Sequence, residues 1–422
     1  MNGTTRPEVV HGIRRWVREV FNEHRVDQVE TLKVADYVDW NPYPGQDVAL
    51  NGFKSVLEEF LASFPDFRYD VDEELFEGDS VVCVGKWYGT MQHDFMGLPA
   101  TGGAYGARRI DSVRFHGDKM TERWGVGNEL KMLRFLGVAD AGPEAAAVGT
   151  FDEAVRLYLD TVLGEGNLGA LDALVDLDAV SDAAGSLVHL AVVGALDDFA
   201  VQVRDVQVHD TTATARVLVS GVFARELWRT APTKTAVAFP ATVSFTGEGP
   251  LITSVTMDYD LAEMARVIGA DPDAEPPLGD VTPTGTAGDA RFVLRSFVQE
   301  ILNRRDISAI PRLVAPGATD YHQETLTLAA LLRAFPDYQF SIERVITDGQ
   351  RVSLLTAFGG THQQPLLGHD ATGTAAITRS ISVFTVADGK VSDILYSFDI
   401  YSLLTRLGIF PEKGRYPGVV QD

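Results

Sequence analysis

Two charged residues with the chemistry of an active site stand close together in the first third of the chain. Arg109 and Asp111 are two positions apart in a strand-like run from 107 to 116, and alternate residues of a strand share one face. A carboxylate flanked by guanidinium groups has a lowered pKa and stays ionised. Asp111 could then act as a base or orient a water, while Arg109 stabilises a developing enolate or alkoxide. The alternative is a purely structural ion pair.

Other catalytic motifs are missing from the sequence. The nine histidines are scattered, and even His362 and His369 lie seven positions apart rather than at the spacing of a helical metal site. There is no glycine-rich phosphate loop, no dinucleotide fingerprint and no Gly-x-Ser-x-Gly nucleophile elbow. The single cysteine, Cys83, lies in an apolar run, so we expect a packed thiol rather than a reactive one. We therefore expect chemistry that needs no cofactor and no metal.

The composition narrows the choice of partners. Among 422 residues, 36 are Lys or Arg and 59 are Asp or Glu, which gives a net charge of −23. So acidic a surface repels phosphate backbones and anionic lipids, and we expect neither nucleic acid nor membrane as a partner. One cysteine cannot form an intrachain disulfide. The first residues lack an apolar signal core, and no run of about 18 apolar residues occurs, so a cytoplasmic protein is the expectation.

The elements that must position the charged residues come in three copies. A Phe-Pro-Asp corner at 64–66 recurs at 335–337 and, in weaker form, as Leu-Asp-Asp at 196–198. In every copy a glycine preceded by Leu or Ile follows the aspartate of the corner after 71 residues. These glycines are Gly137, Gly269 and Gly408. The first copy carries ten extra residues before its corner, which we place in the loop at 42–47.

Small and polar linkers separate the copies. One linker covers 139–144, and the other begins at 271 and continues as a Pro/Thr/Gly-rich stretch to about 289. At about 150 residues per domain, the length agrees with this division. We therefore predict three tandem domains at residues 8–140, 150–270 and 287–413.

Each copy repeats one pattern of helices followed by strands. A first helix is predicted at 13–22, 151–163 and 290–303, a short second helix follows, and a third helix runs into the corner. Four strand-like runs come next, in the first copy at 68–74, 81–90, 107–116 and 120–127. Helices followed by antiparallel strands favour the α+β class. The natural packing is a curved sheet wrapped around the helices, with a pocket between them.

Several motifs carry a resemblance to a known family. The first copy holds Tyr-Val-Asp-Trp-Asn-Pro at 37–42, Gly-Leu-Pro-Ala-Thr-Gly at 97–102 and Arg-Ile-Asp at 109–111, and the third copy holds Gly-Thr-His at 360–362. With the order of the elements, these motifs resemble the SnoaL-like polyketide cyclases of the nuclear-transport-factor-like α+β cone superfamily. The resemblance covers nearly the whole chain in three passes. It implies three tandem α+β cones that form a pseudo-oligomer in one chain, although such a fold serves many functions.

The resemblance also implies a carboxylate that acts as general acid/base on an enolisable polyketide. The usual aspartate of the family lies in the last strand, at positions matched here by Gly125, Met257 and Tyr396, none of which is a carboxylate. If that position faces the pocket, Arg123 faces it too.

The first copy then presents Arg109, Asp111 and Arg123 on one concave surface, with Glu122 and Trp124 facing outward. The remaining substrate-binding residues that we expect in this copy approach from the helix side or lie near the mouth of the pocket: Asp39, Trp40, Asn41, Trp87 and His93.

The third copy offers a different set of polar residues. Asp320, Tyr321 and His322 match residues 39–41, His362 falls where these cyclases often carry histidine, and Tyr396 replaces the missing aspartate. A His–Tyr or His–Asp pair could transfer protons near neutral pH. The alternative is a polar but inert cavity.

The second copy shows no comparable chemistry. It has Ala241, Val243 and Met257 at the pocket positions, and His189 lies in its third helix among apolar residues. We expect a scaffold domain with a packed or surface histidine, with a purely hydrophobic ligand site as the alternative.

Two classes of function stay open. The first is a cofactor-independent cyclase or isomerase that closes a ring in a polyketide-type intermediate of secondary metabolism, as in antibiotic biosynthesis. Its catalytic residues would be Asp111 and Arg109, with His322, His362 and Tyr396 as the set in the third copy. Epoxide opening, as in the limonene-epoxide hydrolases of the same superfamily, is a related enzyme reaction.

The second class is a non-catalytic binder that sequesters a bioactive metabolite for self-resistance. In either class the expected partner is a polyketide-like small molecule. The chain would be a monomer with internal pseudo-symmetry, or a homodimer formed through a convex sheet face that carries Glu122 and Trp124.

Overall fold

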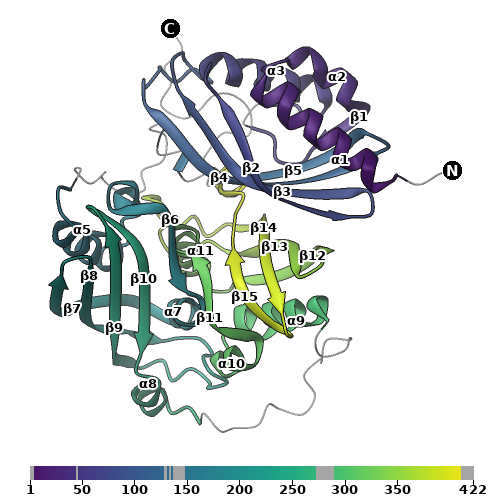
Figure 1. The fold of residues 1–422 in the computed structure, drawn as a ribbon. Coiled ribbons are helices and arrows are strands. Elements are labelled where there is room, and N and C mark those ends of the chain that lie inside the picture. The colour runs from purple at the N-terminus through teal and green to yellow at the C-terminus, as the bar shows by residue number, and fades with distance from the viewer. Residues whose placement is uncertain are drawn as a thin grey trace.

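A computed structural model of the chain describes residues 4–43, 46–127, 131–132, 135, 148–271 and 289–409. Three units with the same order of elements follow one another along the chain (Figure 1). Of the repeated glycine positions, Gly137 falls outside the described residues. None of the helices in the described ranges is both long and apolar enough to cross a membrane.

The first unit packs its helices on one face of a five-stranded sheet with the order β1-β5-β4-β3-β2. Its elements are α1 (Arg6–Arg15), the π-helical η1 (Trp16–Asn22), the 3-10 turn η2 (Val26–Gln28), α2 (Val29–Leu32), β1 (Lys33–Asp39), α3 (Leu50–Ser63), β2 (Arg68–Glu77), β3 (Ser80–Thr90), β4 (Ala104–His116) and β5 (Lys119–Gly127).

The second unit repeats this order, and a helix, α8, follows its last strand. Its elements are α5 (Phe151–Leu157), η3 (Tyr158–Gly164), η4 (Leu168–Ala170), α6 (Leu171–Leu174), β6 (Val175–Asp182), α7 (Ala183–Ala195), β7 (Leu196–His209), β8 (Thr212–Phe223), β9 (Ala236–Glu248), β10 (Leu251–Tyr259) and α8 (Leu261–Ile268).

The third unit has the same order once more. Its elements are α9 (Ala290–Ser296), η5 (Phe297–Asn303), η6 (Ile307–Ala309), α10 (Ile310–Leu313), β11 (Val314–Tyr321), α11 (His322–Ala334), β12 (Gln339–Asp348), β13 (Arg351–Thr361), β14 (Ala375–Ala387), β15 (Lys390–Leu395) and α12 (Ile400–Arg406). The predicted α+β architecture with repeated units is confirmed.

The repeat extends to individual hydrogen bonds. Asp66 of the first Phe-Pro-Asp corner accepts a bond from the backbone N–H of Thr90 at 2.6 Å, and Asp337 accepts the equivalent bond from Thr361 at 2.7 Å. The ten extra residues of the first unit lie between β1 and α3, whereas β6 and β11 run directly into the following helix. This confirms the position predicted for the insertion.

One strand per unit was missed from the sequence. β1, β6 and β11 follow the short second helix, and each pairs in parallel with the last strand of its own unit. In the first unit, Asp39 at the end of β1 lies opposite Arg123 of β5. The expectation that residues 39–41 approach from the helix side is therefore wrong. β1 is the edge strand of the sheet, Asp39 is its last residue, and residues 40 and 41 follow directly.

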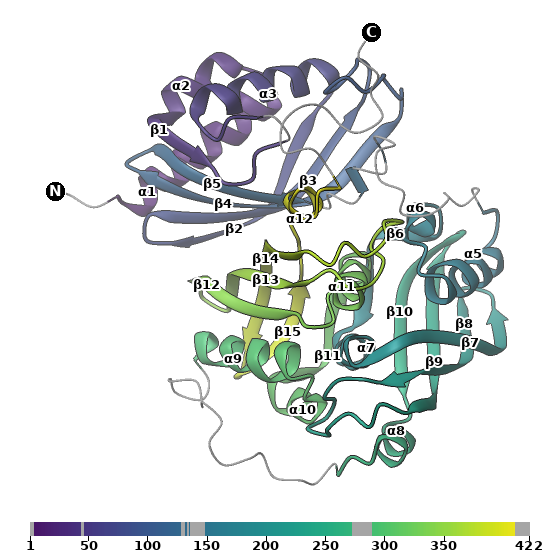
Figure 2. The ribbon, with the colours of Figure 1, turned by 180° about the vertical axis from the view of Figure 1, so that it is seen from behind.

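The second and third units share one continuous sheet of ten strands. β6 and β11 pair antiparallel, with Asp320 opposite Ser181 and Tyr321 opposite Val180. Backbone hydrogen bonds across this junction hold the two units in one register. Figure 2 shows the second and third units side by side beneath the first.

The first and third units pack their sheets against each other through the faces that point away from their helices. A separate apolar cluster fills this contact, and Trp124 and Tyr321 pack at its margin. Charged pairs surround it, among them the two-pronged contact of Arg351 with Glu73 at 2.5 and 2.6 Å. The apolar residues of the cluster are Leu75, Val82, Val84, Ile110, Val126, Ile346, Leu355, Ile381, Val383 and Leu395.

Candidate functional site

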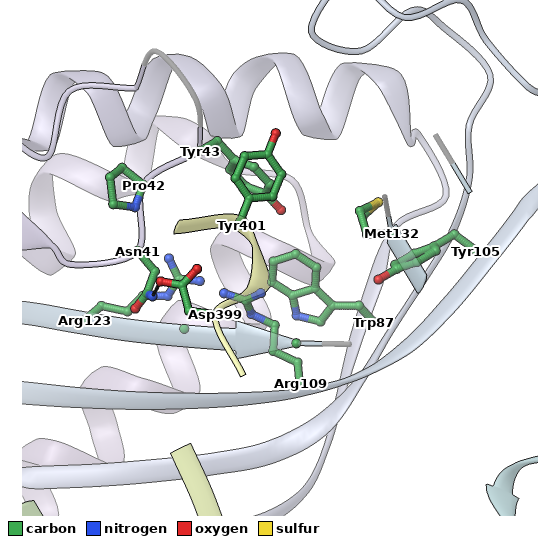
Figure 3. Close-up of a pocket in the computed structure, with 12 residues that line it drawn as sticks. Asn41, Pro42, Tyr43, Trp87, Tyr105, Arg109, Arg123, Met132, Asp399 and Tyr401 are labelled. Carbon is green, nitrogen blue, oxygen red and sulfur yellow. Dashed lines mark hydrogen bonds between the residues drawn. The ribbon is translucent and has the colours of Figure 1, made fainter. Parts of the chain in front are cut away.

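The first unit contains a cavity that opens to solvent between its sheet and the loop that follows β1, and the empty space within it, solvent included, is about 550 Å³. Figure 3 shows ten of the lining residues with labels. The full lining set is Asn41, Pro42, Tyr43, Trp87, Tyr105, Arg109, Arg123, Gly125, Gly127, Met132, Asp399 and Tyr401.

Two arginines present guanidinium groups to this cavity from neighbouring strands. Arg109 lies on β4 and Arg123 on β5, and both donate to Asp111, from Arg109 Nε to Oδ2 at 3.2 Å and from Arg123 Nε to Oδ1 at 2.9 Å. Arg123 Nη1 also donates to Asp39 Oδ2 at 3.3 Å. All four side chains are buried. The predicted grouping of Arg109, Asp111 and Arg123 therefore exists.

The contacts within this cluster keep Asp111 and Arg123 in their charged forms. Burial opposes the ionisation of Asp111, but the adjacent charges of Arg109 and Arg123 outweigh it and hold the pKa of Asp111 below its ordinary value. For Arg123, burial is outweighed by Asp111 and Asp39, so its pKa is raised. Asp111 itself does not line the cavity, because the guanidinium groups do. Asp111 is thus placed to hold the arginines rather than to touch a ligand.

Gly125 explains how two guanidinium groups fit where the resemblance expects an aspartate. A Cβ atom at this position would lie 2.1 Å from Arg109 Nη2, 2.3 Å from Arg123 Nη2 and 2.3 Å from Asp111 Oδ1. The charged cluster occupies the volume that a side chain at position 125 would need. Position 125 therefore cannot carry a carboxylate while the two arginines and Asp111 occupy this volume.

A carboxyl group enters the cavity from the third unit. Asp399 precedes α12, which lies against the first unit (Figure 2). Its Oδ2 accepts a hydrogen bond from Asn41 Nδ2 at 2.5 Å, and its Oδ1 accepts one from the backbone N–H of Ser402 at 2.8 Å. Burial raises the pKa of Asp399, and the hydrogen bonds from Ser402 and Asn41 only partly offset this. The cavity thus joins a carboxyl of raised pKa with two guanidinium charges.

Aromatic rings form the apolar walls of the cavity. The Arg109 guanidinium lies 4.0 Å from the centroid of Trp87, a cation–π contact. The indole N–H of Trp87 has no hydrogen-bond partner among the described residues. Tyr401 of the third unit packs edge to face on Tyr43 of the first at 6.1 Å. Figure 3 shows Tyr401 and Asp399 beside Arg109, Arg123 and Trp87.

Asp399 and Tyr401 were missed from the sequence. In sequence Asp399 is a helix N-cap, as is its counterpart Asp260, whose side chain accepts from the backbone N–H of Glu263. That signal predicts a helix start and nothing about a distant cavity.

Three residues predicted to bind substrate in the first unit do not line this cavity. One of them, Asp39, accepts a hydrogen bond from Arg123 and lines a neighbouring pocket. Trp40 is 46% exposed, stacks on Trp124 at 5.5 Å and donates to Glu122. These contacts place it on the outer side of β5, because β1 ends there and the following residue turns outward. His93 is exposed on the turn after β3 and is not among the lining residues. Asn41 and Trp87, by contrast, line the cavity as expected.

The residues predicted to act together in the third unit have different neighbours. His322 bonds to Tyr158 and Ser181 of the second unit. His362 stacks on Phe335 at 5.4 Å and accepts from the backbone N–H of Thr372 at 3.2 Å. His322, His362 and Tyr396 therefore do not form the predicted set, because His322 is bonded to residues of the second unit instead.

Two of the remaining predicted residues of the third unit, Tyr321 and Asp320, lie at its contacts with the other units. Tyr321 sits 3.8 Å beneath the guanidinium of Arg108 from the first unit. Asp320 accepts from Ser186 and Thr325 at the junction with the second unit. Tyr396 is buried and stacks on Phe398.

Cys83, as predicted, is fully buried in β3. Within the described ranges, no group of three or more His, Cys, Asp or Glu side chains is arranged to hold a metal ion.

Comparisons with known proteins found similar solved structures and one matching family model. One similar solved structure is TsrD from Streptomyces laurentii, which is 20% identical over 32% of this chain and 97% of that chain, with a TM-score of 0.29. Another is the putative polyketide cyclase IdmH from Streptomyces antibioticus, which is 26% identical over 32% of this chain and 100% of that chain, with a TM-score of 0.27. No curated protein matches the sequence. The sequence model of the SnoaL-like polyketide cyclases matches residues 11–136 and 292–407, more than half of the chain. The protein belongs to the SnoaL-like polyketide cyclase family.

Proposed function

We propose that the cavity of the first unit closes a ring in an enolisable, polyketide-type substrate without a cofactor. Family membership supports a cyclase or isomerase type of function. The observation that carries the specific proposal is the meeting of Arg109, Arg123 and Asp399 at one cavity. We also propose that residues 8–140, 150–270 and 287–413 form three tandem domains, the first of which provides the reaction cavity.

The two arginines are suited to stabilise an enolate. Guanidinium groups stay charged at any ordinary pH and donate several hydrogen bonds in a fixed geometry. Because Asp111 holds both Arg109 and Arg123, their positions are set before a substrate arrives, and such preorganised donors lower the energy of a developing oxyanion. In this proposal Asp111 is a positioning residue.

Asp399 is suited to move the proton. As a carboxylate it takes a proton from the carbon beside a ketone, and the C–H electron pair becomes the enolate. The enolate carbon attacks a second carbonyl of the same substrate, which forms a C–C bond and an alkoxide. The alkoxide takes the proton back from Asp399, so atoms and charge balance. A carboxyl of raised pKa serves both steps, because its pKa lies nearer to neutral pH.

The cavity walls favour a flat and largely apolar substrate. Trp87, Tyr105 and Tyr401 line the cavity alongside the charged groups. Aromatic walls bury apolar surface and fold a flexible chain into a reactive shape. A substrate that is apolar along its length and carries ketones at intervals meets both requirements.

The test measures proton exchange at a ketone. α-Tetralone, a flat aromatic ketone, is incubated with the protein in D₂O, and loss of its α-proton signal is followed by NMR. We expect catalysed exchange that falls about a hundredfold in Asp399→Asn. Asparagine keeps the N-cap of α12 and the size of the side chain, so the fold is preserved. Equal exchange rates for the two proteins would disprove the role of Asp399.

One observation favours a second candidate, the sequestering binder. Gly125 leaves the family's usual catalytic position without a carboxylate. A binder would hold a polyketide-type ligand tightly and release it unchanged, and it would show no α-proton exchange with any variant. Epoxide opening is less favoured, because Asp111 lies behind the guanidinium groups and does not reach the cavity to activate a water.

A further inference from the structure

A second cavity lies where the second and third units meet. This cavity opens partly to solvent, and the empty space within it, solvent included, is about 380 Å³. Residues of both units line it, and the antiparallel pairing of Ser181 with Asp320 fixes their relative positions. The lining residues are Tyr158, Leu163, Ser181, Ser186, His189, Val243, Val255, Met257, His322, Thr325 and Leu326. This mixed lining differs from the purely hydrophobic ligand site that was the alternative to a scaffold for the second unit.

His322 stands at the centre of a chain of buried hydrogen bonds. Its Nε2 lies 2.7 Å from the hydroxyl of Tyr158, and its Nδ1 lies 2.7 Å from the hydroxyl of Ser181. A neutral imidazole has one donor nitrogen and one acceptor nitrogen. One of the two hydroxyls therefore donates to His322 and keeps its lone pairs, while the other accepts from His322 and keeps its proton. In either tautomer the cavity is offered one hydrogen-bond donor and one acceptor.

The lining carries no permanent charge. No Asp, Glu, Lys or Arg is among the lining residues in the described part of the chain. Burial lowers the pKa of His322 to about 3 and that of His189 to about 4, so both rings are neutral at neutral pH. His189 is held in turn by the hydroxyl of Tyr259 at 2.8 Å. A charged ligand would be desolvated here without a counter-charge.

One carboxyl lies just behind the wall. Asp320 accepts hydrogen bonds from Ser186 at 3.2 Å and from Thr325 at 2.7 Å, and both of these residues line the cavity. Their hydroxyl protons are thus engaged away from the ligand space. The hydroxyls bonded to His322 therefore offer a ligand one hydrogen-bond donor and one acceptor.

We propose that this second cavity binds an uncharged, largely apolar small molecule through a hydroxyl or ketone group. Apolar residues make up much of the rest of the lining, with Val243, Val255 and Met257 on the sheet side. The site differs from the first cavity, whose two guanidinium groups favour negative charge. The proposal stands independently of the reaction proposed for the first unit.

The test compares naphthol, which is neutral at neutral pH, with the naphthoate anion by equilibrium dialysis. Met257→Trp fills the second cavity, and Met132→Trp is the matched change in the first cavity. We expect one bound equivalent of naphthol that is lost in Met257→Trp and kept in Met132→Trp. We also expect no competition from naphthoate for that equivalent. Circular dichroism checks that each variant is folded.

A second variant keeps the test decisive if Met257→Trp does not fold. His322→Phe keeps an aromatic ring at this position but removes the hydrogen bonds to Tyr158 and Ser181. We expect the affinity for naphthol at this site to fall about tenfold. The proposal is overturned if naphthol binding is unchanged in Met257→Trp, if it is unchanged in His322→Phe, or if naphthoate binds the same site as tightly as naphthol.

Discussion

Asp399 accepts a hydrogen bond from Asn41 at 2.5 Å, although the two residues are 358 positions apart in the chain. Asn41 follows the edge strand of the first unit, and Asp399 precedes the last helix of the third. The first cavity is therefore completed by the opposite end of the protein. Any activity of this cavity depends on the packing of the first unit against the third.

Gly125→Ala should damage the charged cluster directly. The added Cβ would meet Arg109 Nη2 at 2.1 Å and Arg123 Nη2 at 2.3 Å, and the bonds of both guanidinium groups to Asp111 restrict how far they can move aside. We expect a loss of about 2 kcal/mol in the free energy of unfolding, measured by urea denaturation, and slower exchange of α-tetralone. Gly127→Ala, whose nearest contact would be 3.2 Å, is the control and should lose less. Equal losses would contradict the assignment of a close approach to Gly125.

Asp111→Asn should be strongly destabilising, because it leaves two buried guanidinium groups without their shared carboxylate. Removing one member of a buried charge pair costs about 3–5 kcal/mol, and urea denaturation would measure it. Asp178→Asn is the matched control, since Asp178 also faces two cations but its side chain is 54% exposed. We expect the control to lose less than about 1 kcal/mol. A loss at Asp111 no larger than at Asp178 would refute the buried cluster.

The contribution of Asp320 to stability should fall as the pH rises. Burial raises the pKa of this carboxyl from 3.8 to about 7. Between these values the folded protein holds a proton that the unfolded chain has lost, so the free energy of unfolding decreases with increasing pH. Asp320→Asn removes this effect. The stability of the variant relative to the unchanged protein should therefore rise with pH, by up to about 1.4 kcal/mol per pH unit.

Urea denaturation of both proteins at several pH values across this window gives the comparison. Glu324 has a pKa raised to about 7, chiefly by burial, but it is present in both proteins and its effect cancels in the difference. Two parallel curves would show that Asp320 titrates normally in the folded protein.

The contact between the sheets of the first and third units should carry much of the stability of the assembly. Ile381 is fully buried in this contact, whereas Ile377 on the same strand is 56% exposed. We expect Ile381→Ala to cost about 2–5 kcal/mol and Ile377→Ala less than about 0.5 kcal/mol. Thermal or urea unfolding measures both. Similar small effects would mean that the two sheets do not pack as described.

Local patterns were enough to predict the repeated α+β units and one face of the candidate site. Arg109 and Asp111 are two residues apart on one strand, and strand alternation alone places them on the same side. The Phe-Pro-Asp corners likewise recur with the same hydrogen bond in the first and third units. These features depend on backbone geometry over a few residues, which the sequence encodes directly.

Only the tertiary structure decided which unit completes which cavity. Asp399 and Tyr401 line the cavity of the first unit, and His322 lines the cavity between the second and third units. All three residues belong to the third unit. Asp399 and Tyr401 were not singled out in the sequence, and His322 was predicted to act with His362 and Tyr396. Their roles arise from the sheet contact between the first and third units and from the β6–β11 pairing, which join residues far apart in the chain. Such contacts depend on the complementary surfaces of whole folded units, and no local period in the sequence specifies them.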